Sequence, residues 1–228
     1  MENDTAQSGT VESPLESAAR HTGGGAEAAP GHDAAQSERA ARVAVEQRRL
    51  REWAEAHGKL KGKIPPEDSR GGEHTVHFHE RTQRYLKATR PDAQLGYGIA
   101  HGSYSQGATP GEYLDRLVIH NQIFNDDIRL ERVVVCGTKL SIVTSQPFIK
   151  GRDATGPEID AYMTGKGFER IGEGAFWHPA AGLYVHDLLP KNAKCDDHGM
   201  VQPIDPVIQR VTREFAEFLR EDFYRRRT

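Results

Sequence analysis

The spacing of hydrophobic residues changes several times along the chain, and each spacing predicts a type of element. Over residues 37–57 the apolar side chains recur with a helical period, which predicts a helix with one buried face. Residues 73–89 alternate between apolar and polar on either side of a short turn, which predicts a β-hairpin. After Thr109 and Pro110, a good N-cap and first-turn pair, helical spacing returns over residues 110–125.

The second half of the chain contains shorter predicted elements, again both strands and helices. They are an antiparallel pair over 128–150, a short helix over 155–164, a hairpin within 167–178, two extended segments within 182–208 and an amphipathic helix over 207–223. Hairpins interspersed with helices predict an α+β fold built on antiparallel sheets.

Composition divides the chain unevenly. Its 228 residues suffice for one domain with tails, but aromatic residues make up only 7%. Residues 1–36 contain no Phe, Tyr, Trp or Ile, so we expect this segment to bury too little apolar surface to fold. Residues 58–72, rich in Lys, Pro and Gly, have the composition of a linker.

Charge and cysteine content exclude several classes of function. A net charge of −3 provides no general attraction to nucleic acids or membrane surfaces. The chain lacks an apolar run of about 20 residues, as a membrane span would require, and its N-terminus does not have the order of a secretion signal. Cys136 and Cys195 lie far apart without a CxxC partner, so we expect reduced thiols and a cytoplasmic protein.

Residues 182–208 carry the strongest chemical pattern. A hydrophobic run leads into Asp187, Asn192 follows five positions later, and a second apolar approach ends at Asp205. Two carboxylates and one amide at the ends of extended segments suit metal-assisted phosphoryl transfer, in which one acid orients the attacking hydroxyl and the others hold Mg²⁺. This spacing also occurs by chance, because Asp and Asn are common in turns.

The order of the elements strengthens this interpretation. A glycine pair precedes a hairpin whose second strand contains Lys87; a helix, two strands and a connector follow, and then the Asp–Asn–Asp set. The stretches GGEHTVHFHERTQRYLKAT, IRLERVVV and VHDLLPKN with VQPIDP resemble the protein-kinase-like superfamily. Over about residues 45–210 the chain is most similar to the kinase domains of the large polyvalent proteins of phages and conjugative elements.

This resemblance implies a two-lobed kinase-like fold with an antiparallel N-lobe sheet and a minimal C-lobe. Only 23 residues follow Asp205, which leads us to expect a reduced C-lobe. The expected layout is a disordered tail (1–36), a helix and linker (37–72), the N-lobe (73–151), the C-lobe (152–224) and a basic tail (225–228).

The resemblance also implies ligands for individual residues. Gly71 and Gly72 would lie over the phosphates of ATP, and Lys87 would contact its α- and β-phosphates. An acid on the 110–125 helix would orient Lys87, with Glu112 favoured and Asp115 as its rival.

The remaining implied roles fall between the connector and the end of the 182–208 stretch. Backbone groups near Gln146 would bind the adenine of ATP. Asp187 would be the catalytic acid, while Asn192 and Asp205 would hold Mg²⁺. The phosphate acceptor, a protein or a small molecule, is not identified by these residues.

Several departures from the family pattern leave a second hypothesis open. His186 directly precedes Asp187, Asp205 is followed by Pro-Val instead of Phe-Gly, and a full G-x-G-x-x-G loop is missing. These features allow a catalytically weak pseudokinase that binds nucleotide and acts as an interaction module.

A third hypothesis uses histidines. His77 and His79 fall on one face of the predicted strand and could form a metal-ligand pair. Together with His186, Asp187 or Asp205 they would form the site of a metal-dependent hydrolase. Solvent-facing strand histidines are the simpler interpretation.

Overall fold

The structure is a computed structural model that describes residues 11–23, 36–92, 96–100 and 103–225. Helices and antiparallel sheets are mixed along the chain, which confirms the predicted α+β character. Parts of the predicted tails, residues 1–10, 24–35 and 226–228, lie outside the described residues.

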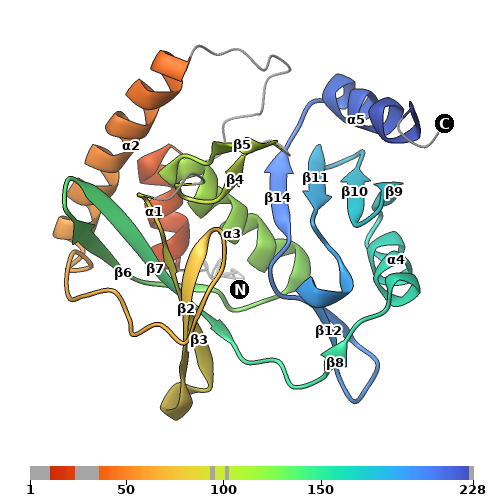
Figure 1. Cartoon of the computed structure of the whole chain (residues 1–228), viewed down its shortest axis with the longest axis horizontal. Helices are drawn as coiled ribbons and strands as arrows, with labels where there is room; N and C mark the ends of the chain where they lie inside the picture. The colour runs from red at the N-terminus through yellow and green to blue at the C-terminus, as the bar shows by residue number, and fades with distance from the viewer. Residues whose placement is uncertain (1–10, 24–35, 93–95, 101–102, 226–228) are drawn as a thin grey trace, which may run out of the picture.

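A five-stranded antiparallel sheet forms one half of the molecule (Figure 1). Its strands, in spatial order, are β1 (Ser69–Arg70), β2 (His74–His79), β3 (Arg84–Thr89), β7 (Lys139–Pro147) and β6 (Arg129–Cys136). The turn between β2 and β3 is a short 3-10 helix, η1 (Glu80–Thr82), and ends at Gln83 in the left-handed conformation. The hairpin predicted over 73–89 and the antiparallel pair predicted over 128–150 are therefore present, and the β3–β7 pairing joins them in one sheet.

Smaller sheets form the other half. One is a four-stranded antiparallel sheet with β14 (Val207–Arg210), β11 (Leu183–His186), β10 (Ala175–His178) and β9 (Glu169–Gly172) in that order. Another joins β13 (Val201–Pro203), β12 (Ala193–Cys195) and β8 (Arg152–Asp153), with η2 (Pro190–Asn192) leading into β12. A separate pair, β4 (Ile99–Ala100) and β5 (Ser103–Gly107), precedes the central helix.

Local capping signals determine where two helices begin. Helices α3 (Pro110–Phe124) and α4 (Gly156–Gly165) each follow a threonine whose hydroxyl accepts a hydrogen bond from the N3 backbone N–H, while the N3 glutamate binds back. Helix α2 (Gln36–Ala56) covers the predicted 37–57 segment. None of the described helices is long and apolar enough to cross a membrane.

The segment predicted to be disordered contains an ordered helix, α1 (Pro14–Thr22). Ser13 and Glu16 form a capping box at its start, and Leu15, Ala18 and Ala19 are buried. Trp53 of α2 donates a hydrogen bond of 3.0 Å to Ser17. The expectation of disorder was wrong for this stretch. Three small or medium apolar residues are enough to hold the helix in place, because other elements of the fold supply the apolar surface against which they pack.

The last predicted helix begins later than expected. Val207 and Ile208 belong to strand β14, which pairs with β11, and the helix α5 covers Arg213–Arg225. The backbone N–H of Phe215 donates to the hydroxyl of Thr212 at 3.3 Å, which marks the helix start. The β-branched pair at the start of the segment favours the strand.

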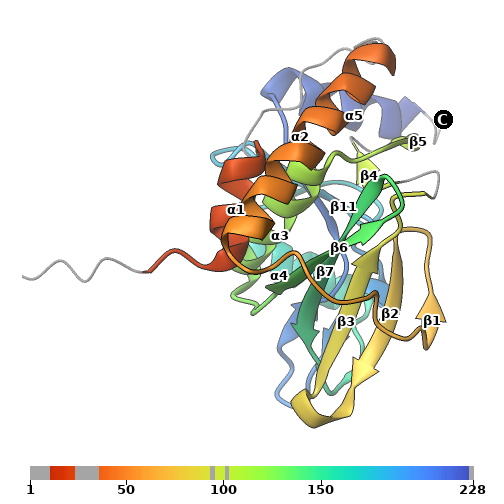
Figure 2. The same ribbon diagram turned by 90° about the vertical axis from the view of Figure 1, so that its left-hand side faces the viewer.

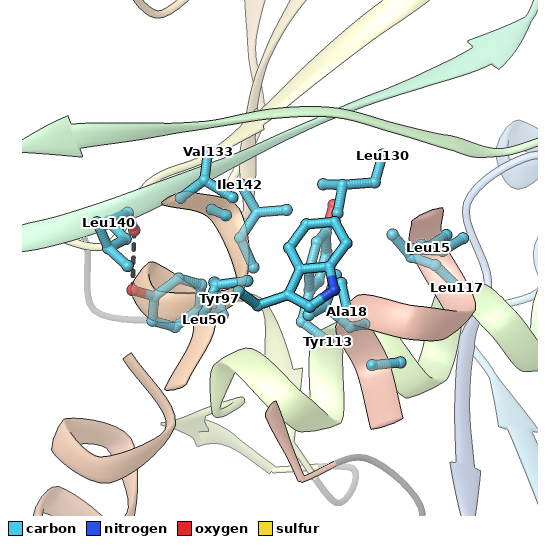
Figure 3. Packing of buried hydrophobic residues seen from close by; sticks show 14 of the residues in the cluster. Leu15, Ala18, Leu50, Tyr97, Tyr113, Leu117, Leu130, Val133, Leu140 and Ile142 are labelled. Carbon is cyan, nitrogen blue, oxygen red and sulfur yellow. Dashed lines mark hydrogen bonds between the residues drawn. The ribbon is translucent and has the colours of Figure 1, made fainter. Parts of the chain in front are cut away.

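Helix α3 lies between the two halves and contributes to the core of each (Figures 1 and 2). Leu114 and Leu117 pack in a cluster with α1, α2 and the five-stranded sheet. Ile119 and Phe124 pack in a second cluster with α4 and the smaller sheets. Figure 3 shows the first cluster, in which the Tyr97 hydroxyl donates to the carbonyl of Leu140 at 2.8 Å. The position of α3 is thus fixed from both sides.

Candidate active site

Strand register places Lys87 at the centre of the five-stranded sheet. It lies opposite Val76 on β2 and opposite Thr144 on β7. Its ammonium group binds a carboxylate oxygen of Asp205 at 3.1 Å and donates to the carbonyl of Ile204 at 3.0 Å. The strand lysine therefore points away from the sheet and toward the end of the 182–208 stretch.

A cleft of about 390 Å³ opens beside this ion pair, a size within the usual range for small-molecule sites. Tyr85 lies two residues from Lys87 along β3, so an apolar end with Tyr85 and Phe148 is offset from the end with the Lys87–Asp205 pair. The other lining residues include Val76, opposite Lys87, and Gln146, opposite Tyr85, together with Pro147, Ile149, Asn192 and Lys194. An amphiphilic molecule with a flat apolar part and an anionic part matches this division.

Asp187 and Asn192 are held together by the tight turn after β11. Asp187 has a φ of +54°, a left-handed conformation that Asp tolerates better than most residues. The amide nitrogen of Asn192 donates to the carbonyl of Asp187 at 2.6 Å and to its carboxylate at 3.0 Å. These bonds fix the Asp187 side chain and leave the amide oxygen of Asn192 as the group that could bind a cation.

A main-chain hydrogen bond links this turn to Asp205. The backbone N–H of Ile204 donates to the carbonyl of Asn192 at 2.9 Å. Asn192 and Asp205 both line the cleft, so an amide oxygen and a carboxylate are presented to the same space. Oxygen ligands of this kind fit Mg²⁺, which commonly uses one or two carboxylates together with substrate phosphates.

The two aspartates have opposite electrostatic environments. Burial raises the pKa of Asp187, and Lys191 and the Asn192 hydrogen bond oppose only part of that effect. Burial also acts to raise the pKa of Asp205, but nearby positive charge outweighs it and holds the pKa well below its usual range, with Lys87 the largest contributor. Asp205 is therefore ionised at neutral pH.

The helix acid predicted to orient Lys87 has a different partner. Glu112 binds Arg39 of α2 at 2.7 Å and caps its own helix by accepting the backbone N–H of Thr109 at 2.9 Å. Its rival, Asp115, binds Arg210 at 3.4 Å. The residues of α3 that share a cavity with Lys87 are Tyr113, Arg116, Leu117 and His120, and the acid that binds Lys87 is Asp205.

An ion pair not predicted from the sequence lies next to the site. Arg116 of α3 binds Glu73 at 2.8 Å, with side-chain exposures of only 6% and 14%. Burial favours neutral forms, but this pairing lowers the pKa of Glu73 and raises that of Arg116. Tyr113, Arg116 and His120 share one face of α3 and line a small cavity beside Lys87. Their helical spacing in the sequence could have indicated that Arg116 lies near the site.

Gly71 and Gly72 form the connection between β1 and β2, directly before Glu73. The backbone N–H of Gly71 donates to the carbonyl of His74 at 2.9 Å, which closes the turn. Gln146, near the end of β7, lines the cleft, but its side-chain amide donates to Asp126 at 2.6 Å. The role predicted for each of these residues remains a prediction.

His77 and His79 do not converge with the aspartates. His77 binds Asp68 at 3.1 Å, and His79 binds Thr82 at 2.7 Å, on the turn side of the hairpin. Within residues 11–23, 36–92, 96–100 and 103–225, no group of three or more His, Cys, Asp or Glu residues could hold a metal ion. The described residues therefore give no support to the hydrolase hypothesis, since each histidine has a local partner.

Comparison with known proteins agrees with the sequence resemblance. The family described as "Serine/Threonine/Tyrosine Kinase found in polyvalent proteins" matches residues 44–212, which include the hairpin, α3 and the whole Asp–Asn–Asp stretch. Searches of curated proteins and of solved structures return no match. The chain belongs to the kinase family found in polyvalent proteins.

Proposed function

We propose that this protein is an ATP- and Mg²⁺-dependent phosphotransferase that moves the γ-phosphoryl group to a hydroxyl of a protein or small molecule. In this proposal the five-stranded sheet with α3 is one lobe, the smaller sheets form a reduced second lobe, and nucleotide binds in the cleft between them. The observation that carries the proposal is the convergence of Lys87, Asn192 and Asp205 on that cleft.

Each residue has a distinct task in this reaction. Lys87 would neutralise charge on the non-reacting phosphates, as the family's strand lysine does. Asp187 would accept a hydrogen bond from the acceptor hydroxyl, align its oxygen with the γ-phosphorus and take its proton as the new P–O bond forms. The bond from the γ-phosphorus to the bridging oxygen then breaks, and ADP leaves.

Asn192 and Asp205 would hold the metal through an amide oxygen and a carboxylate. Mg²⁺ bound there would supply positive charge to the phosphate oxygens. The lowered pKa of Asp205 keeps this ligand ionised, and the raised pKa of Asp187 makes its carboxylate a better proton acceptor. The two environments thus fit different roles, with Asp205 as the metal ligand and Asp187 as the base.

The test separates binding from catalysis. The purified full chain should gain thermal stability with Mg·ATP, since a ligand that binds only the native state stabilises it by about 2.7 kcal/mol at 100 times Kd. Incubation with Mg·ATP should then give ADP and a phosphorylated residue detected by mass spectrometry. Asp187→Asn should keep the thermal shift and lose transfer, whereas Asp197→Asn, on an exposed turn of the same stretch, should keep both.

Each alternative outcome has a clear meaning. Binding without ADP formation in the wild-type protein would establish the pseudokinase alternative. A wild-type protein that shows neither a shift nor turnover at millimolar nucleotide would overturn both versions of the proposal.

A further inference from the structure

The apolar end of the cleft is built from one face of the β2–β3 hairpin. Side chains two apart on a strand share a face, so Tyr85 projects on the same side as Lys87. Their partners in register, Phe78 and Val76, share that face on β2. The sequence alternation thus places a tyrosine next to the lysine that we assign to phosphate binding.

Three aromatic rings gather at this end. Phe78 and Tyr85 have ring centroids 5.1 Å apart, and Phe148 lies 5.6 Å from Phe78 and 6.0 Å from Tyr85. Phe148 is 43% exposed although it is large and apolar. Tyr85 and Phe148 both line the cleft, so an incoming flat ring would meet aromatic surface there.

Two hydrogen-bond donors beside these rings already have partners. Pro147 has no backbone N–H to donate. The N–H of Phe148 donates to the carbonyl of Gln83 at 2.9 Å. The side-chain amide of Gln146 donates to Asp126 at 2.6 Å. These two donors at the rim are therefore not free to read the edge of a base, which limits the directed hydrogen bonding that distinguishes one purine from another.

From these observations we infer that Tyr85 and Phe148 hold the nucleotide base by stacking, and that the site accepts ATP and GTP with similar affinity. The inference rests on the proposed function, because Lys87 must hold the phosphates at the other end of the cleft. Stacking on aromatic rings tolerates different bases, since every base has a π-face.

Calorimetric titration of the full chain with Mg·ATP, Mg·GTP and magnesium tripolyphosphate tests the inference. The two purine nucleotides should bind within about threefold of each other, and tripolyphosphate, which lacks a base, should bind more weakly. Tyr85→Ala and Phe148→Ala should each weaken both nucleotides by about 5-fold to 150-fold and leave tripolyphosphate unchanged.

Two further variants serve as controls. Tyr85→Phe keeps the ring and should bind both nucleotides as the wild type does. Phe218→Ala removes another half-exposed phenylalanine, on α5 and outside the cleft lining, and should change none of the three affinities.

Distinct results would overturn the inference. A preference for ATP over GTP of about 30-fold or more would show hydrogen-bonded base recognition and leave the proposed phosphotransferase intact. Unchanged nucleotide binding in Phe148→Ala, whose exposed ring can be removed with little effect on folding, would exclude it from the base site. Absence of binding by all three ligands would overturn the proposed function as well.

Discussion

Lys87 and Asp205 are 118 positions apart in the chain, yet the ammonium nitrogen and a carboxylate oxygen lie 3.1 Å apart. The register of β3 between β2 and β7 fixes the lysine, and the short β13 strand brings the aspartate to it. The pair joins the five-stranded sheet to the second half of the molecule at the edge of the cleft. The charge of Lys87 also favours the ionised form of Asp205, which its proposed role as a metal ligand requires.

Removal of Asp205 should abolish the metal response. In Asp205→Ala the proposed site loses its only charged Mg²⁺ ligand, so we expect transfer to fall on the order of 10²–10³-fold. ADP formation measured across a Mg²⁺ series checks this, with Asp197→Ala as the matched exposed control. Retained Mg²⁺-dependent turnover would remove Asp205 from the proposed site.

The buried Arg116–Glu73 pair should be important for stability. Glu73→Gln leaves the Arg116 guanidinium, 6% exposed, without its carboxylate partner, and breaking a buried pair in this way costs about 3–5 kcal/mol. Urea unfolding should show the loss, and Glu73→Gln combined with Arg116→Met should recover part of it.

The exposed pair of Arg20 and Glu12, with side-chain exposures of 70% and 42%, provides the control for this experiment. Glu12→Gln should leave the urea midpoint unchanged because solvent screens such pairs. If Glu73→Gln behaved like this control, the Arg116–Glu73 pair would not contribute to folding stability.

Features set by neighbouring residues could be predicted from the sequence. The start of α3 follows from Thr109 and Pro110, because the cap bonds only groups within one turn. The β2–β3 hairpin, with Lys87 on its second strand, follows from alternation around one turn. The spacing from Glu112 back to Thr109 also fits a capping box, which the structure contains beside the ion pairs of Glu112 with Arg39 and Arg42.

Features set by distant contacts could not be predicted. Glu112 binds Arg39, which is 73 positions away, and local spacing contains no information about that choice. Helix α1 was missed for a related reason. Its composition alone cannot offset the entropy of ordering, and its stability comes from apolar surface that other elements supply.

Helix α1 should therefore contribute strongly to stability. Leu15, only 2% exposed, packs in the core cluster with α2, α3 and the sheet, so Leu15→Ala should cost about 2–5 kcal/mol. Urea denaturation measures this cost, with Val11→Ala, at a position 95% exposed, as the control. A truncated chain lacking residues 1–23 should show a comparable or larger loss; an unchanged midpoint would mean that α1 does not pack on the domain.

His186 should make folding stability sensitive to mildly acidic pH. Its ring stacks on Tyr184 with centroids 5.1 Å apart, and none of the described residues forms a hydrogen bond with its buried Nε2 atom. Burial lowers the pKa of His186 from 6.5 to about 4, so the folded protein keeps this ring neutral where the unfolded chain protonates it. The stability is fully present above pH 6.5 and is lost as the pH falls from 6.5 toward 4.

The expected slope is about 1.4 kcal/mol per pH unit for each such histidine. His74, with a pKa lowered by burial to about 4, and His120, whose pKa burial also lowers, add contributions of the same sign. His186→Phe keeps a ring against Tyr184, so unfolding measured from pH 7.5 to 5 should show a smaller slope than the wild type, with equal or higher stability at pH 7.5. His198→Phe, at an exposed turn, should retain the full slope. An unchanged slope in His186→Phe would show that folding does not lower the pKa of His186.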